Sequence, residues 1–553
     1  MFERVSVMSI LFNRKLFKRL AFAAVLACFF AAASPVAARD GFGGFEGTGV
    51  SSGEERSRIL LAFPDYAASK SGSRNRALLE YQEYVFVTGE PVLLKGTLTI
   101  EKTVKNDIVI TRYTYLLNNF ARGFQLTRET EYETTSTVKS DGQIVTETVV
   151  TRVPSRVPTE KIVTDGHTYT LRRFEFTRTS LIDVRPAVQY YSGNTWYRKQ
   201  YEVGGGVVTS SSGDYLYVEA TGGFVGFDEA WGEADIETTE YLISYTQNYM
   251  SDWGGGTREL WSGVANVKRA QSLATDLRYI DNEPDAISFR GGYLETRSND
   301  NLLEISARMP EFDEVGNSTD RIKNYTDSTQ ISTFPYTKRL VSPDVKQVRG
   351  HWSEAAIERL FGLEILNARP SEYEPDQYIT RAEFAGMIVA AAKPIPSDPL
   401  IVQNNKKKIA KKSKDEPPPS FTDVPADHEY YAQIEEAFAR GMMAPIDKNE
   451  FRPNEKMVVS DAAVAFIRAL GLEAVVSANG AITEFPDDTI IPAYARDALY
   501  IAQKIGLLRG DETGKINPLK ELTNAEAAVM VDRFVAYMGH EIKADYREHI
   551  MDY

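Results

Sequence analysis

The chain has 553 residues, a formal net charge of −14 and a single cysteine. A chain this acidic is repelled by phosphate backbones, so we expect no nucleic-acid partner. One cysteine cannot form an internal disulfide, and the five histidines show none of the spacings of metal sites, so we expect neither a metal nor a cofactor.

The first 38 residues have the composition of a secretory signal peptide. Basic residues from Arg14 to Arg19 precede the apolar run LAFAAVLACFFAAA, and small residues lead to an expected cut after Ala38. The run is shorter than the roughly 20 apolar residues that a spanning helix needs, so we expect no membrane segment after cleavage. Residues 1–38 carry a net charge of +4, so the mature chain would have a charge of −18.

Cys28 offers a second interpretation of this N-terminus, because a cysteine within an apolar leader can be a lipidation site. Leu26 is an awkward neighbour for that modification, and apolar sequence continues past the cysteine. We therefore favour cleavage, and the chain is expected to be exported.

Residues 39–79 begin with a glycine-rich run and are predicted to be flexible. From residue 80 to 335 the composition changes to short runs of Thr, Val, Tyr and Ile broken by Gly, Asn and Asp. The clearest piece is TEYETTSTVKSDGQIVTETVVTRV, in which Asp141-Gly142 is a hairpin turn signal. Strands without long intervening helices predict an all-β antiparallel region, sandwich-like or barrel-like.

Five carboxylates surround Trp231 in the stretch GFDEAWGEADIE. They are Asp228, Glu229, Glu233, Asp235 and Glu237. Paired carboxylates flanking a glycosidic bond could cleave a glycan, with the tryptophan as the floor of the site. Alternate residues of a strand share one face, however, and a charged, solvated edge strand resists unwanted pairing. We favour the solvated edge and assign no catalytic residue.

Near residue 342 the hydrophobic period becomes helical. Apolar residues at three- and four-residue spacing predict three helix pairs, each joined by a short proline-containing loop. The predicted pairs are 352–366 with 380–392, 431–443 with 460–471, and 494–508 with 523–538. One pair cannot bury its own apolar face, so the three copies are expected to pack together as an all-α domain in an α+β multidomain chain.

Two of the second helices begin with the pattern of a capping box. Thr380 with Glu383, and Thr523 with Glu526, place a side-chain acceptor at the N-cap and a glutamate three residues later. The linker 394–420 between the first two pairs is rich in lysine and proline. It is either a solvated tether or a basic arm that touches an anionic wall polymer, and we favour the tether.

These pairs resemble the S-layer homology (SLH) family. FTDVPADHEYYAQIEEAFARGMM and FPDDTIIPAYARDALYIAQKIGLLRGD look like openings of its repeats, and ITRAEF matches its most characteristic stretch. The resemblance divides the C-terminal region into repeats at 340–393, 421–472 and 483–540. It implies a three-repeat domain whose grooves bind a secondary wall polysaccharide, often through a pyruvylated sugar.

The resemblance also implies the residues of the binding site. The family has an aromatic residue near the start of the first helix, which Trp352 and Tyr494 match, whereas Glu429 stands at that place in the second copy. The family arginine follows the N-cap threonine, and Arg381 matches it. We expect the aromatic rings to stack on sugars and the guanidinium to pair with a carboxylate, helped by the positive end of the adjacent helix.

Thr380 and Glu383 complete this expected glycan-binding set as the capping pair that flanks Arg381. Asp461 and Asn524 replace the arginine in the other two copies, so only one groove looks complete. Asp461 beside an anionic sugar would be repulsive, which predicts a dead or altered second site.

The expected function is therefore that of a secreted protein held non-covalently at the cell wall, its partner being a wall polysaccharide or another peptidoglycan-associated glycan. The β region is expected to be a structural or binding module, with self-assembly into a surface layer as one role. The alternative is a wall-anchored, glycan-cleaving enzyme that uses the carboxylates near Trp231.

Overall fold

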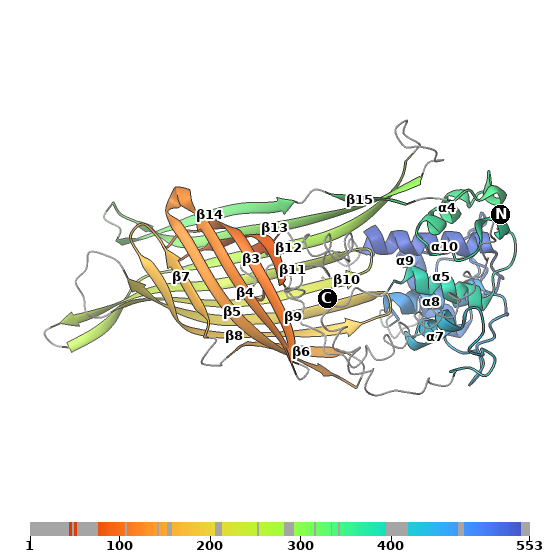
Figure 1. The fold of residues 1–553 in the computed structure, drawn as a ribbon, viewed down its shortest axis with the longest axis horizontal. Coiled ribbons are helices and arrows are strands. Elements are labelled where there is room, and N and C mark those ends of the chain that lie inside the picture. The colour runs from red at the N-terminus through yellow and green to blue at the C-terminus, as the bar shows by residue number, and fades with distance from the viewer. Residues whose placement is uncertain are drawn as a thin grey trace, which may run out of the picture.

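The fold comes from a computed structural model, which describes most of the chain. The described residues are 44–46, 49–51, 76–105, 108–140, 143–151, 157–204, 213–251, 254–280, 292–314, 317–332, 335–340, 343–393, 419–473 and 481–542. The expected signal peptide, with Cys28, and almost all of the linker 394–420 lie outside the described residues. A sheet occupies one end of the long axis, and a group of helices the other (Figure 1).

The described part of the N-terminal region is one antiparallel sheet of 15 strands. The strands are β1 (Gly49–Ser51), β2 (Arg76–Val85), β3 (Val92–Lys105), β4 (Ile108–Asn119), β5 (Phe124–Val138), β6 (Ile144–Val150), β7 (Thr159–Val163), β8 (Thr168–Val184), β9 (Val188–Gly204), β10 (Asp214–Glu229), β11 (Glu233–Ser251), β12 (Gly254–Ile280), β13 (Gly292–Phe312), β14 (Ser318–Ser332) and β15 (Tyr336–Leu340).

Most strands pair with their neighbours in sequence, as antiparallel hairpins require. The exceptions are β7, which pairs with β5 and β8, and β15, which pairs with β13. Strands β5 and β6 pair as an antiparallel hairpin as predicted, with Val138 opposite Ile144, while the turn residues Asp141-Gly142 lie outside the described residues.

The sheet is rolled, so that its first and last strands meet. The Tyr84 hydroxyl of β2 donates to Asp327 of β14 at 2.8 Å, and the Asn301 amide of β13 donates to the carbonyl of Ser51 in β1 at 2.8 Å. In Figure 1 strands β3 to β5 cross over strands β9 to β13. The expected antiparallel β region is thus present as one rolled sheet, the barrel-like alternative.

Part of the glycine-rich segment that was expected to be flexible lies inside this roll. Phe45, Glu46 and Val50 are buried, and the Phe45 ring lies 5.2 Å from the ring of Tyr132. Glu46 accepts hydrogen bonds from Tyr132 at 2.9 Å and from Lys199 at 2.6 Å. These contacts make the described residues of the segment part of the hydrophobic core, although the glycine content had predicted a flexible segment.

The interior of the roll also holds ionised side chains. Arg128 donates to both carboxylate oxygens of Glu83, at 3.0 and 2.8 Å, and to Glu160 at 2.8 Å. Lys199 lies between Glu160 and Glu46, at 2.7 and 2.6 Å. Buried charges are stable only when paired and hydrogen-bonded, and each member of this cluster has a partner of opposite charge.

The described C-terminal region contains the six expected helices. They are α4 (Glu354–Gly362), α5 (Arg381–Ala391), α7 (Tyr431–Ala439), α8 (Val459–Leu470), α9 (Arg496–Lys504) and α10 (Asn524–Ala536), followed by the π-helix η8 (Tyr537–Glu541). This region also has the short 3₁₀ turns η4 (Lys346–Val348), η5 (Pro370–Glu372), η6 (Asp488–Ile490) and η7 (Ala493–Ala495), whereas η2 (Phe120–Arg122) lies between β4 and β5. The expectation of an all-α domain is not confirmed, because extended loop residues pair between the helix pairs. The pairs are Tyr378–Thr523, Thr380–Lys456 and Val458–Glu521.

Turns between strands of the sheet cap the C-terminal ends of α5 and α8, the second helices of the first two pairs. Trp231 donates its indole N–H to the Ala391 carbonyl of α5 at 3.1 Å, and the Ala187 N–H donates to the Ala469 carbonyl of α8 at 2.9 Å. The last carbonyls of a helix lack partners within the helix, so these contacts satisfy them. One buried hydrophobic cluster continues from the sheet into the helices. The N-terminal ends of α5 and α8 therefore point away from the sheet.

Candidate functional site

The three loops that precede the second helices close into a ring. The Ile379 N–H donates to the Leu522 carbonyl at 3.0 Å, Leu522 donates to Met457 at 2.8 Å, and Met457 donates back to Ile379 at 3.0 Å. Each loop thus gives and receives one backbone hydrogen bond. The three helix pairs are held in a cyclic arrangement, with the N-termini of α5, α8 and α10 around the ring.

The first N–H group of each second helix is already bonded to a neighbouring pair. The bonds are Arg381 to the Glu455 carbonyl at 2.8 Å, Val459 to Lys520 at 3.1 Å, and Asn524 to Gln377 at 2.8 Å. These donors would otherwise be free at a helix N-terminus. These first N–H groups are therefore not available to a ligand, and help from the positive end of the helix stays a prediction.

Both predicted capping boxes are present. Thr380 Oγ1 accepts from the Glu383 N–H at 3.2 Å, and Glu383 accepts from the Thr380 N–H at 2.8 Å. Thr523 and Glu526 repeat the arrangement, whereas Val458 supplies no side-chain cap to α8. The side chains of Thr380 and Glu383 thus fix the start of α5 beside Arg381, and their contact with a glycan stays a prediction.

Arg381 is nearly enclosed, with 4% of its surface exposed. Its guanidinium donates to the Phe451 carbonyl at 3.0 Å, to the Ala444 carbonyl at 3.0 Å and to Asp461 at 3.2 Å. Burial lowers the pKa of Arg381, and the neighbouring Asp461 carboxylate acts in the opposite direction. The planar guanidinium group therefore connects the first helix pair to the loop and to the second helix of the second pair.

Asp461 connects this arginine to an exposed aromatic ring. The Tyr494 hydroxyl donates to Asp461 at 2.7 Å and lies 3.0 Å from the Ser460 hydroxyl. Partial burial raises the pKa of Tyr494, while the hydrogen bond with Ser460 acts against that rise, and the ring remains 61% exposed. Arg381, Asp461 and Tyr494 come from three different helix pairs. Together with Ser460 they form one cluster, which we call the tyrosine junction.

The tyrosine junction corrects one expectation from the sequence. Arg381 and Asp461 were assigned to separate grooves, and Asp461 was expected to repel an anionic sugar. In the structure the two side chains are 3.2 Å apart, so Arg381 offsets the charge of Asp461. Ser460 was not identified from the sequence as a site residue, because its contact with Tyr494 joins positions 34 residues apart.

Trp352 flanks a different junction. Its ring is 64% exposed and lies 5.5 Å from the ring of His351. His351 Nε2 is 3.5 Å from the Asp376 carboxylate, in the loop whose Glu374 carbonyl accepts from the Asn524 amide at 2.9 Å. The Asn524–Glu374 hydrogen bond runs between the third and first helix pairs, whereas the contacts of His351 lie within the first pair. Trp352 thus has the exposure expected of a ligand platform, with Asn524 at the place that Arg381 takes elsewhere.

The carboxylates near Trp231 are not on an edge strand. Strand β11 pairs with β10 on one side and β12 on the other, so the expectation of a solvated edge is wrong. Glu237 is buried between Arg178 and Arg269, at 2.7 and 2.8 Å, and Asp235 also pairs with Arg269. The Trp231 ring is buried against the helices, where it does not offer a floor to a substrate.

Comparison with known proteins identifies part of the helical region. Residues 343–385 and 420–457 match the family model of the S-layer homology domain. The chain carries S-layer homology repeats. Because this domain is a cell-surface anchor, the chain is a secreted, cell-surface protein anchored through its SLH repeats. Among the described residues, no helix is both long enough and apolar enough to cross a bilayer.

Three curated relatives are similar to parts of this SLH-containing chain. An amylopullulanase of Thermoanaerobacterium thermosulfurigenes is 28% identical over 38% of the chain and 10% of its own length. A surface-layer 125 kDa protein of Lysinibacillus sphaericus is 31% identical over 23% of the chain and 11% of its own length. Exoglucanase XynX of Acetivibrio thermocellus is 27% identical over 33% of the chain and 15% of its own length. The chain thus spans at most 15% of these three relatives.

Proposed function

We propose that the three helix pairs form one anchoring domain that binds an anionic secondary wall polysaccharide, and that the rolled sheet is a structural or binding module displayed on the surface. The third pair, 483–540, lies beyond the matched segments. Its capping box at Thr523 and its place in the ring of loops support counting it as a third SLH repeat.

The observation that carries this proposal is the tyrosine junction. An exposed Tyr494 ring can stack on the C–H face of a sugar, while Asp461 and Ser460 can bond its hydroxyl groups. A carboxylate on the sugar would compete with Asp461 for Arg381, whose 3.2 Å bond is the longest of its three. Trp352 supplies a second exposed ring at the next junction.

The position of the junctions supports the same proposal. The C-terminal ends of α5 and α8 contact the sheet, so the tyrosine junction lies at the far end of these helices. A helix of 11 or 12 residues is about 17 Å long. The wall polymer can therefore be bound at one end of the molecule while the sheet is presented at the other.

Sedimentation with purified cell-wall sacculi tests the proposal. Tyr494→Ala should weaken co-sedimentation of the full chain about tenfold, since it removes both the ring and the contact with Asp461. Co-sedimentation of Tyr494→Phe should be weaker than that of the native chain but stronger than that of Tyr494→Ala. Tyr249→Ala, which removes an exposed tyrosine from β11, is the matched control and should have no effect. Walls stripped of non-peptidoglycan polymer should bind neither the native chain nor any of these variants.

Arg381→Ala should also weaken binding, but it leaves two carbonyls and Asp461 without their buried partner. Thermal unfolding must accompany that assay. Asp461→Asn should bind at least as well as the native chain, because it removes the charge that competes for Arg381. Equal loss of binding by a folded Arg381→Ala and by Asp461→Asn would contradict the proposed role of the arginine.

The role of the sheet remains a separate proposal with two alternatives. Ordered two-dimensional arrays of the purified chain in electron micrographs would support a lattice-forming module. Turnover of wall or plant glycans, lost on replacing Glu233 or Glu237, would support a glycan-cleaving enzyme instead. The buried position of Trp231 and the ion pairs of Glu237 favour the structural role.

A further inference from the structure

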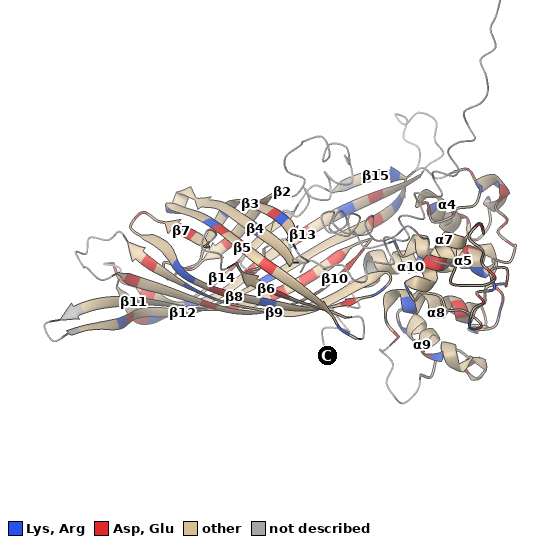
Figure 2. Cartoon of the chain, turned by 60° about the horizontal axis from the view of Figure 1, so that its bottom comes forward, with Lys and Arg blue, Asp and Glu red and all other residues tan. Residues whose placement is uncertain are grey.

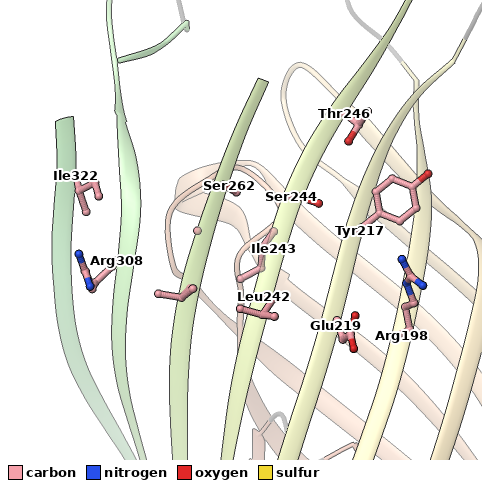
Figure 3. A pocket seen from close by; sticks show the side chains of 12 residues that line it. Arg198, Tyr217, Glu219, Leu242, Ile243, Ser244, Thr246, Ser262, Arg308 and Ile322 are labelled. Carbon is pink, nitrogen blue, oxygen red and sulfur yellow. The ribbon is translucent and has the colours of Figure 1, made fainter. Parts of the chain in front are cut away.

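A hollow of about 640 Å³ lies on the outer face of the rolled sheet and is lined only by residues of its strands. Figure 3 shows its side chains projecting from consecutive strands on the face turned away from strands β3 to β5. Leu242 and Ile322 are 53% and 58% exposed there, whereas Ile243, the next residue along β11, is buried in the interior. Neither the SLH repeats nor the buried charge cluster accounts for this surface.

The register of the sheet places two arginines at opposite sides of the hollow. Arg198, Glu219, Leu242, Val264 and Arg308 lie opposite one another in β9, β10, β11, β12 and β13. Four strand spacings separate the two arginine positions, or about 19 Å. A ligand that contacts both must therefore be extended and must lie across the strands.

The charge of the hollow is opposite to that of the whole chain. Neither Arg198 nor Arg308 forms an ion pair with a residue that the structure describes. Glu219 lies between them and accepts a hydrogen bond from the Trp196 indole at 3.2 Å. Figure 2 shows acidic and basic residues interspersed along the strands. The residues that line the hollow carry one net positive charge in a chain of net charge −14, and Glu175 of β8 lies opposite Arg198 on its other side.

Between the arginines the surface is partly apolar and partly hydroxylated. The half-buried Tyr217 ring lies 6.0 Å from the Arg198 guanidinium. Leu242 and Ile322 provide apolar contacts, and Ser244 and Ser262 provide hydroxyl groups. A ligand that fits this lining has C–H faces, hydroxyl groups and separated negative charges.

We propose that this hollow binds an acidic oligosaccharide that lies across strands β9 to β13, with carboxylates paired to Arg198 and Arg308 and one sugar ring against Tyr217. An acidic peptide is the less favourable ligand. Peptides add to sheets through backbone bonds at an edge, and each of these five strands is already paired on both sides. Recognition on the face of the sheet must use side chains alone.

Titration calorimetry with galacturonate oligomers long enough to reach both arginines tests this proposal. All chains compared carry Tyr494→Ala, which weakens the proposed wall-binding junction equally in each of them. These oligomers should bind, and the double change Arg198→Ala, Arg308→Ala should weaken binding at least about tenfold. Added salt should weaken binding as well, because the contacts are exposed ion pairs. Tyr217→Phe should keep most of the affinity, whereas Tyr217→Ala should not.

Arg339→Ala is the matched control, because it removes an exposed arginine of β15 that does not line the hollow. It should leave binding unchanged. Equal binding of neutral glucose oligomers of the same length, tighter binding of poly-glutamate peptides, or no effect of the double arginine change would each overturn the proposal. Because every chain compared carries Tyr494→Ala, a difference between them reports on the hollow and does not depend on the proposed anchoring function.

Discussion

Glu364 stands where the first helices of the other two pairs are followed by a glycine. Its φ angle is 58°, and those of Gly441 and Gly506 are 76° and 70°. A left-handed backbone costs a residue with a side chain roughly 1–2 kcal/mol, which glycine avoids. The sequence departs from the glycine of the other copies at this position, but the backbone conformation is kept.

Glu364→Gly should therefore raise the free energy of unfolding by up to about 1 kcal/mol, since part of the relieved strain is offset by the entropy of glycine. Urea unfolding measures the change. Glu358→Gly is the matched control inside α4, where the same substitution should lower stability by about 1 kcal/mol. A stability loss from Glu364→Gly would show that its side chain matters more than its backbone.

Glu229 is a buried carboxyl group at the end of β10. Neither of its carboxylate oxygens has a hydrogen-bond partner among the described residues. Burial, and then the nearby Asp228, raise the pKa of Glu229 well above its usual value. The folded state then binds a proton that the unfolded state has lost, so stability falls as the pH rises from the unfolded pKa of about 4.3 through the raised folded pKa.

Glu229→Gln should remove this part of the pH dependence. The variant should lose less stability than the native chain between pH values of about 5 and 8, measured by urea unfolding at each pH. Burial also raises the pKa of Asp532 to about 6, but that group is present in both proteins and cancels in the comparison. Glu240→Gln, on the exposed face of β11, should leave the profile unchanged. Parallel pH profiles for the native chain and Glu229→Gln would contradict the assignment.

At the scale of elements, the buried ion cluster connects the N-terminal segment with strands β2, β5, β7 and β9. Lys199 of β9 holds Glu160 of β7 and Glu46 of the N-terminal segment. Burial acts to raise the pKa of Glu160, but Arg128 and Lys199 outweigh it and hold that pKa at about 2. The stability contributed by Glu160 is therefore present above pH 4.5 or so and is lost as the pH falls toward 2.

Lys199→Met should destabilise the fold by about 3–5 kcal/mol at neutral pH, because it leaves buried carboxylates without a cation. Thermal or urea unfolding measures the loss. Lys268→Met is the control, since Lys268 pairs with Glu304 at 3.7 Å on the exposed face of the sheet. It should change stability by less than about 1 kcal/mol. Similar effects of the two changes would show that the buried cluster contributes little.

At the scale of the whole molecule, the sheet and the helices share one hydrophobic cluster. Trp231 is buried in it and donates to the end of α5, and Tyr190 donates to the Leu470 carbonyl of α8 at 3.2 Å. We therefore expect the two parts to unfold together. For the proposed anchor, this contact gives the displayed sheet a defined orientation with respect to the bound wall.

Trp231→Ala should cost about 3–5 kcal/mol and separate the melting of the sheet from that of the helices. Scanning calorimetry should show one transition for the native chain and two for the variant. Phe120→Ala, which removes an exposed ring from the turn η2 between β4 and β5, should keep a single transition. Two transitions in the native chain would contradict the coupling.

Local sequence determined the elements of this protein and the starts of its helices. Period and turn chemistry indicated the antiparallel strands and the six helices, and the capping boxes at Thr380 and Thr523 form as predicted. These features depend on residues only a few positions apart, so they can be read without the fold. The SLH match reflects the same short-range patterns.

Only the tertiary structure decided which side chains meet. Asp461 lies 80 residues from Arg381 and 33 from Tyr494, and nothing local indicates that the ring of loops brings them together. In the sheet, alternation showed which residues share a face, but charged residues are normally placed outside. Lys199 and Glu160 lie inside because the rolled sheet encloses them and each is paired with an opposite charge that offsets the cost of burial.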